Sequence, residues 1–195
     1  MLQDIKSVEL RNLQIEDYKQ LKTSMIESYP GMVDSYWEEN HIQKLLKIFP
    51  EGQLVIVVDG KVVGSALSLI VHEKLVDKNS DYKTVTGNYT FSTHTKDGEI
   101  LYGIDVFIHP NYRGLRLGRR LYDARKELCE QFNLKAIVFA GRIPNYAQHA
   151  KDLTPKEYIE KVNKKELHDP VLSFQLSNDF HVMRIMKNYL EGDKK

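Results

Sequence analysis

The segment from residue 101 to residue 141 constrains the fold most, because a helix there separates two strands. LYGIDVFI (101–108) and LKAIVFAG (134–141) are almost entirely apolar, which predicts buried strands. Between them, residues 117–132 are predicted to be a helix whose buried face carries Leu117, Leu121, Ala124, Leu128 and Phe132. A strand–helix–strand unit of this length predicts two parallel strands joined by a right-handed crossover.

An antiparallel hairpin is predicted earlier in the chain. In QLVIVVDGKVVGSALSLIV (53–71), two β-branched runs flank Asp59 and Gly60, and Asp-Gly between such runs favours a two-residue hairpin turn. SVELRNL (7–13) alternates apolar and polar residues like a short strand. A chain with both kinds of strand pairing predicts a mixed sheet.

The other predicted elements are helices at 15–29, 35–49 and 154–167, and a last strand at 179–190, DFHVMRIMKNYL. Thr154, Pro155 and Glu157 form a capping box with proline in the first turn. The polar stretch 72–98 is predicted to be a long loop, and loops of that length in compact domains are commonly functional. Helices on both faces of the mixed sheet complete the predicted fold.

Composition excludes several classes of protein. The chain has 195 residues and a net charge of +1, so we expect one domain, 1–195, and no nucleic-acid partner. The single cysteine, Cys129, excludes an internal disulfide and is expected to be a buried apolar residue. No run reaches the roughly 18 apolar residues of a membrane span. Because the N-terminus also lacks an apolar core of signal-peptide length, we expect a cytoplasmic protein with no membrane partner. The histidines show no metal-binding spacing, so we expect no metal.

The turn before the predicted helix at 117 is typical of an anion site. PNYRGLRLGRR (110–120) combines Gly114 with several arginines. A helix N-terminus presents unpaired N–H groups and a partial positive charge, which suits a phosphate or pyrophosphate. Neither GxxxxGK[ST] nor an N-terminal GxGxxG is present, which argues against a P-loop or a dinucleotide-binding fold. An RNA-binding helix built on the same arginines is a weaker alternative.

These residues resemble the acetyl-coenzyme A (acetyl-CoA) loop of the GNAT superfamily of N-acyltransferases. Arg113–Gly118 corresponds to the signature Q/R-x-x-G-x-G/A, and Ile108-His109-Pro110 corresponds to the preceding V-x-P. The departure is Arg116, where the family usually has glycine. DVFIHPNYRGLRLGRRLYDARKEL, GRIPNY and DPVLSFQLSNDF are also similar to a bacterial GNAT subgroup found ahead of carbon–nitrogen hydrolase domains.

The resemblance implies a GNAT fold, which is α+β with three layers and a mixed, mainly antiparallel sheet of about six to seven strands. It implies that acetyl-CoA is the acyl donor, with its pyrophosphate on the amides from Leu115 to Arg119. The pantetheine arm would pair with β-strand residues 106–108, and an N–H near Val106 would polarise the acyl carbonyl. The implied cofactor-binding residues are Val106, Phe107, Ile108, Arg113, Gly114, Leu115, Arg116, Leu117, Gly118 and Arg119.

Two residues are candidates for proton transfer. Asp105 is the charged residue within LYGIDVFI; burial would raise its pKa and suit it to act as a base, although a structural carboxylate is an equal alternative. GNAT enzymes often use a C-terminal tyrosine as the acid, but Phe174 and Gln175 stand where it would lie. Tyr146, in GRIPNY, is the substitute candidate, and water is the alternative acid.

The resemblance therefore implies an N-acetyltransferase that acts on a primary amine by direct attack in a ternary complex. The alternative is a non-catalytic acyl-CoA-binding domain that regulates a partner or fused carbon–nitrogen hydrolase. The amine is left open, as is a possible homodimer. Residues 29–32 and the 72–98 loop are expected to contact the acceptor.

Overall fold

The computed structural model describes residues 5–29, 36–77, 80–187 and 189. It divides the chain into two compact units, Met1–Phe139 and Ala140–Lys195, and each is described by itself. In the part that the structure describes, no helix is both long enough and apolar enough to span a bilayer.

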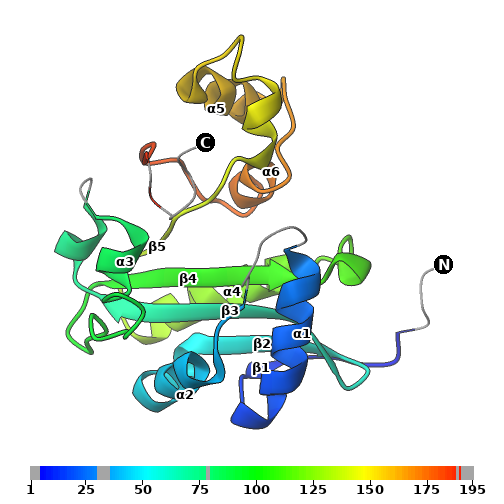
Figure 1. Cartoon of the computed structure of the whole chain (residues 1–195), viewed down its shortest axis with the longest axis vertical. Helices are drawn as coiled ribbons and strands as arrows, with labels where there is room; N and C mark the ends of the chain where they lie inside the picture. The colour runs from blue at the N-terminus through cyan, green and yellow to red at the C-terminus, as the bar shows by residue number, and fades with distance from the viewer. Residues whose placement is uncertain (1–4, 30–35, 78–79, 188, 190–195) are drawn as a thin grey trace. The chain divides into compact units, whose positions relative to one another are not determined.

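The first unit is built on one mixed sheet with the strand order β1-β2-β3-β4-β5 (Figure 1). Its strands are β1 (Val8–Asn12), β2 (Gln53–Val58), β3 (Lys61–Val71), β4 (Ile100–Ile108) and β5 (Ala136–Phe139). The first four strands pair antiparallel, and β4 pairs parallel with β5. The hairpin at Asp59-Gly60 and the parallel unit are both confirmed.

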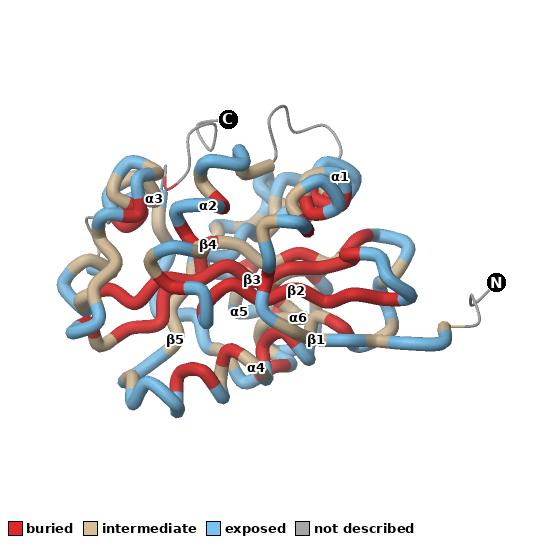
Figure 2. Tube along the Cα trace, turned by 90° about the horizontal axis from the view of Figure 1, so that it is seen from below, coloured by how far each residue is buried: buried red, intermediate tan, exposed pale blue. Residues whose placement is uncertain are grey.

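Helices cover both faces of this sheet. The α-helices of the first unit are α1 (Tyr18–Ser28), α2 (Glu39–Ile48), α3 (Tyr82–Val85) and α4 (Leu117–Gln131). Short 3-10 turns, η1 (Ile15–Asp17), η2 (Pro50–Gly52), η3 (Glu73–Val76) and η4 (Pro110–Tyr112), connect them to the strands. Figure 2 shows α1 and α2 on one side of the sheet and α4 on the other.

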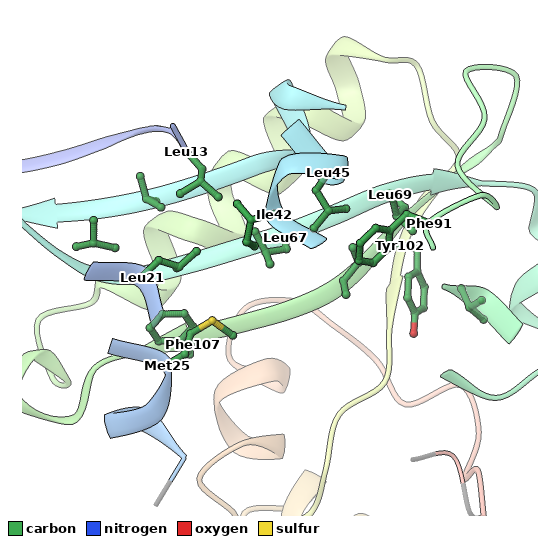
Figure 3. Packing of buried hydrophobic residues seen from close by; sticks show 14 of the residues in the cluster. Leu13, Leu21, Met25, Ile42, Leu45, Leu67, Leu69, Phe91, Tyr102 and Phe107 are labelled. Atoms are coloured by element: carbon green, nitrogen blue, oxygen red, sulfur yellow. The ribbon is translucent and has the colours of Figure 1, made fainter. Parts of the chain in front are cut away.

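Both faces of the central strands are therefore apolar. On one face Leu21 and Met25 of α1 and Ile42 and Leu45 of α2 pack on the sheet (Figure 3). On the other face Leu117 and Leu121 of α4 pack against β2 and β3. This explains why QLVIVV is apolar at every position after its glutamine, since a strand covered on both sides loses the alternation of a surface strand.

The second unit contains η5 (Pro144–Gln148), α5 (Pro155–Asn163) and α6 (Leu172–Leu176). The predicted capping box at α5 is confirmed, with Thr154 Oγ1 accepting from the Glu157 N–H. Asp169 is fully buried in this unit. Its Oδ1 accepts from the N–H groups of Val171 and Leu172, and its Oδ2 accepts from the Asn145 N–H and the Tyr158 hydroxyl. The second unit is thus organised around one carboxylate.

Three predictions about elements were wrong. The sheet has five strands among the described residues, not six to seven. Residues 181–187 form no strand; Val182, Met183 and Ile185 are exposed, because an alternating pattern makes a strand only where a neighbouring strand pairs with it. The strand at 134–141 is shortened to β5 and is only partly buried.

The boundaries of two further predictions also changed. The second helix begins at Glu39, and residue 35 lies outside the described residues. The 72–98 stretch contains η3 and α3, and the Asp81 carboxylate caps α3 by accepting from the Thr84 N–H at 2.7 Å.

Candidate active site

A bulge in β4 decides where Asp105 points. Leu67 of β3 pairs with Asp105 and Ser68 pairs with Gly103, so Ile104 is one residue extra. Ahead of the bulge, Ile100 and Tyr102 face the α1–α2 side, and after it Phe107 does. One inserted residue reverses the alternation of a strand. The bulge therefore places the Asp105 side chain on the α1–α2 side, where Tyr29 bonds to it.

Asp105 lies partly exposed among aromatic side chains. The Tyr29 hydroxyl donates to Asp105 Oδ1 at 2.8 Å. Desolvation raises the pKa of Asp105 above its usual value, against the lowering effects of the Tyr29 hydroxyl, the Arg125 charge, the Val106 N–H and Trp37. A carboxylate with a raised pKa can take a proton near neutral pH.

The far edge of β4 presents backbone N–H groups with which β5 does not pair. The His109 N–H donates to the Val63 carbonyl of β3. Because backbone groups alternate along a strand, the N–H groups of residues 107 and 109 point toward β3, and those of residues 106 and 108 point away from it. Strand β5 pairs with β4 only as far as Gly103. The N–H groups of Val106 and Ile108 therefore point to an edge that β5 leaves uncovered. Phe107 is instead buried in the core.

The predicted anion turn follows this edge directly. Gly114 has φ +82°, and a Cβ built on it would meet nothing within 4 Å. Arg116 precedes α4 in the left-handed conformation, φ 58°, which costs a non-glycine residue about 1 kcal/mol. Helix α4 has no side-chain cap and no acidic residue in its first turn. The first-turn amides at Leu117, Gly118 and Arg119 are thus available to an anion.

The arginines of the turn differ in what they do. Arg116 and Arg119 are exposed, and Arg119 lies 3.9 Å from Asp123. The Arg113 side chain bends back, so that Nε donates to the Ile108 carbonyl at 3.2 Å and Nη2 to the Ser28 carbonyl at 3.5 Å. Arg113 therefore joins the end of α1 to the end of β4. Leu115 is partly buried against the sheet.

Tyr146 lies in the second unit. Its hydroxyl donates to the Leu153 carbonyl at 3.0 Å, and its ring packs at an angle against Tyr158. Cys129 is buried, as expected, and burial raises the pKa of its thiol, which disfavours a nucleophilic thiolate.

The region expected to contact the acceptor is only partly described. Tyr29 does reach Asp105, but residues 30–32 lie outside the described residues. From the 72–98 stretch, the Tyr82 hydroxyl donates to the Ile104 carbonyl. Trp37 contacts Tyr82, Tyr89 and Phe91, with ring centroids 5.5–6.5 Å apart. The Asp105 side of the sheet is therefore bordered by aromatic rings.

Sequence reasoning missed Arg125, which is 1% exposed. It lies four residues after Leu121 and three before Leu128, on the face predicted to be buried. A charge within an apolar stripe is the signal that could have identified it. The predicted buried face is otherwise confirmed at Leu117, Leu121 and Leu128, whereas Phe132 is 36% exposed.

A comparison with known families tests the predicted resemblance. Residues 9–153 match the model of the acetyltransferase (GNAT) family. The chain belongs to this family. The GNAT fold and the resemblance predicted from the turn are confirmed.

Two relatives from Bacillus subtilis (strain 168) match nearly the whole chain. The probable hydrolase YhcX is 39% identical over 96% of this chain, and the uncharacterized N-acetyltransferase YkwB is 30% identical over 95% of it. The match covers 83% of YkwB but only 36% of YhcX. The chain therefore spans about a third of the length of YhcX.

Two solved structures share the fold. The loading GNATL domain of CurA from Lyngbya majuscula superposes with a TM-score of 0.81 and 23% identity, covering 97% of this chain and 92% of that one. The GphF GNAT-like decarboxylase in complex with isobutyryl-CoA superposes with a TM-score of 0.73 and 18% identity, covering 95% and 93%. At these identities the likeness concerns the fold alone.

Proposed function

We propose that this chain transfers an acetyl group from acetyl-CoA to a primary amine by direct attack in a ternary complex. The observation that carries the proposal is the make-up of β4. This strand carries Asp105 on one face, has the N–H groups of Val106 and Ile108 along an edge that β5 leaves uncovered, and leads into the uncapped N-terminus of α4. A candidate base, a backbone edge and a candidate anion site thus follow one another along β4 and the start of α4.

The residues of β4 and α4 would hold the donor. The N–H groups of Leu117, Gly118 and Arg119 suit a pyrophosphate, and the space around Gly114, three residues before them, is open. The edge of β4 would pair with the amide groups of a pantetheine arm. The Val106 N–H also lowers the pKa of Asp105 by hydrogen bonding, so an acyl oxygen at this position would share that donor with the carboxylate.

Asp105 would act as the base in this proposal. Its carboxylate accepts a proton from the substrate ammonium, and the amine nitrogen then attacks the acyl carbon. The carbon–nitrogen bond forms, the nitrogen gives up its second proton to water, the carbon–sulfur bond breaks, and the thiolate leaves with a proton from the Tyr146 hydroxyl or from water. In the first case Tyr146 must exchange its bond to Leu153, and Tyr146→Phe would lower turnover. If that variant has wild-type turnover, water is the acid.

A second candidate is an acyl-CoA-binding domain without turnover. Phe174 and Gln175, both in α6, stand where the family usually has the tyrosine that acts as the general acid. The lack of this tyrosine favours the second candidate. The greater length of YhcX and its name, probable hydrolase, support a partnership with a carbon–nitrogen hydrolase domain. A homodimer and a cytoplasmic location are also part of the proposal.

Calorimetric titration with acetyl-CoA, CoA and 3′-dephospho-CoA tests the donor site first. We expect micromolar binding that Gly114→Trp abolishes, because the indole occupies the space before the helix amides. Gly60→Trp is the matched control: Gly60 also has a positive φ, +79°, and open space around it, but lies in the β2–β3 hairpin. Absence of binding at millimolar ligand, or equal loss in both variants, would contradict the donor site.

Turnover with a panel of amines then separates the candidates. Formation of acetylated amine supports the proposal, and tight binding without turnover supports the second candidate. Because GphF is a decarboxylase, the panel includes dimethylmalonyl-CoA, whose decarboxylation gives isobutyryl-CoA. Release of CO₂ without amine transfer would contradict acetyl transfer.

A further inference from the structure

Arg125 of α4 is a large, fully buried side chain that lies at the bulge. Its Nη2 donates to the Leu67 carbonyl of β3 at 2.7 Å and to the Asp105 carbonyl of β4 at 2.6 Å, and its Nε donates to Ser68 Oγ at 3.1 Å. Leu67, Ser68 and Asp105 are the residues at which the register shifts. The guanidinium thus joins the two strands where their ladder is interrupted.

Gly103 provides the space for this side chain. A Cβ built on Gly103 would lie 3.0 Å from Arg125 Nη1, 3.2 Å from its Cζ and 3.2 Å from Phe139 Cβ. These contacts are closer than packed side chains usually make, so any larger residue at 103 would displace the guanidinium or β5. In the sequence LYGID, Gly103 and Asp105 therefore flank the bulge at Ile104. Gly103 leaves room for the Arg125 guanidinium, and the Asp105 carbonyl accepts from it.

The bulge sets the direction of the Asp105 side chain and the direction of the N–H groups that follow it. It brings Asp105 to the α1–α2 side, beside Tyr29, and it turns the N–H groups of Val106 and Ile108 to the edge beyond β5. Without the extra residue at Ile104, a regular strand would point Asp105 toward α4. A buried carbonyl needs a donor, and Arg125 supplies one to each strand.

We propose that Arg125 is a positioning residue, which holds the bulge of β4 so that Asp105 and the N–H edge that β5 leaves uncovered both face the reacting groups. The proposal rests on the proposed acyl transfer for its kinetic consequences. Its structural part, the orientation of residues 104–108, stands without a substrate. Arg125 also contributes a positive charge that lowers the pKa of Asp105.

Three variants and one control test this role. Arg125→Met removes both the charge and the donors, and Arg125→Lys keeps the charge but lacks a planar fork. Gly103→Ala keeps Arg125 itself but displaces its guanidinium or β5. Glu127→Gln is the control, because it removes an exposed charge from the same helix. Each is measured for kcat, for KM, for the pH dependence of kcat/KM and for amide hydrogen exchange of residues 104–108.

We expect Arg125→Met to lower kcat on the order of a hundredfold, as misplacement of reacting groups does. The acid limb of its pH profile should move to higher pH, because the charge that lowers the pKa of Asp105 is gone. Arg125→Lys should return the acid limb toward that of wild type while kcat stays reduced. Residues 104–108 should exchange faster in both variants, and Glu127→Gln should match wild type.

Wild-type kcat and an unmoved acid limb in folded Arg125→Met would overturn the proposal. If Arg125→Met does not fold, the test rests on Gly103→Ala. A lower kcat and faster amide exchange at residues 104–108 in that variant support the positioning role of Arg125. Wild-type values of both quantities overturn the positioning role. Failure of the proposed function is a separate result. If the wild type transfers no acyl group, faster exchange at 104–108 in the variants still supports the positioning role, and unchanged exchange overturns it.

Discussion

Asp105 in the first unit and Asp169 in the second are both carboxylates bonded to a tyrosine hydroxyl, but their surroundings differ. Asp169 is fully buried, and its two oxygens accept four hydrogen bonds, three of them from backbone N–H groups. Asp105 remains partly exposed, and desolvation outweighs its donors, so its pKa is raised. Burial alone therefore does not identify a candidate base; Asp105 is the candidate because it combines access with a raised pKa.

The tyrosines that bond to these two carboxylates, Tyr158 to Asp169 and Tyr29 to Asp105, also differ. Burial and the Asp169 carboxylate raise the pKa of Tyr158 to about 12, so this phenol stays protonated and acts as a fixed donor. Tyr29 bonds to Asp105 from the C-terminal end of α1. We interpret the first pair as structural and the second as functional.

The largest expected effect is on turnover. Asp105→Asn keeps the shape of the side chain but cannot accept the proton of the ammonium, so kcat should fall on the order of 10²–10⁴-fold. Affinity for CoA should not change, because the proposed donor site consists of backbone N–H groups. Steady-state kinetics and calorimetry on the same preparation measure both quantities, and unchanged turnover at every pH would remove Asp105 from the mechanism.

The pH dependence of the unfolding free energy gives a second test of Asp105. The folded-state pKa of Asp105 is raised, so protonation favours the folded state. That contribution is complete below the ordinary carboxylate pKa, about 3.9, and is lost as the pH rises through the raised value. At neutral pH, Asp105→Asn should therefore be at least as stable as wild type in urea unfolding, and the difference should disappear in acid.

Next in size is the effect of Asp169→Ala on stability. The substitution leaves the N–H groups of Val171 and Leu172 and the Tyr158 hydroxyl without their acceptor. A loss of about 2–5 kcal/mol in unfolding free energy is expected, together with faster amide exchange between residues 145 and 172. Asp152→Ala, at an exposed aspartate of the same unit, is the control. Equal stability of both variants would end the contrast between the two carboxylates.

The smallest effects come from the matched tyrosines. Tyr158→Phe should cost about 1 kcal/mol, the net value of one hydrogen bond. Tyr29→Phe removes a donor that lowers the pKa of Asp105, so the acid limb of kcat/KM should move to higher pH. Thermal unfolding and a pH profile of both variants measure these effects. A moved acid limb in Tyr158→Phe and not in Tyr29→Phe would reverse the assignment.

Local sequence signals were sufficient for most of the fold. The Asp59-Gly60 hairpin, the parallel unit and the α5 capping box were each predicted from a few adjacent residues. The signature turn at Arg113–Gly118 was enough to predict the family. Such signals depend on backbone conformation and periodicity, which neighbouring residues specify. The strand predicted at 179–190 failed because strand formation also needs a partner, which no local pattern contains.

Some features of the candidate site were likewise predictable from local sequence, and others were not. The sequence by itself determined that an arginine-rich helix start follows a buried strand with one aspartate. Only the tertiary structure decided which side of the sheet Asp105 faces, since that depends on a bulge whose register is set by β3 and Arg125. It likewise brought Tyr29 to Asp105 across 76 positions of the chain. Pairing register and long-range contacts arise between segments, and no single segment encodes them.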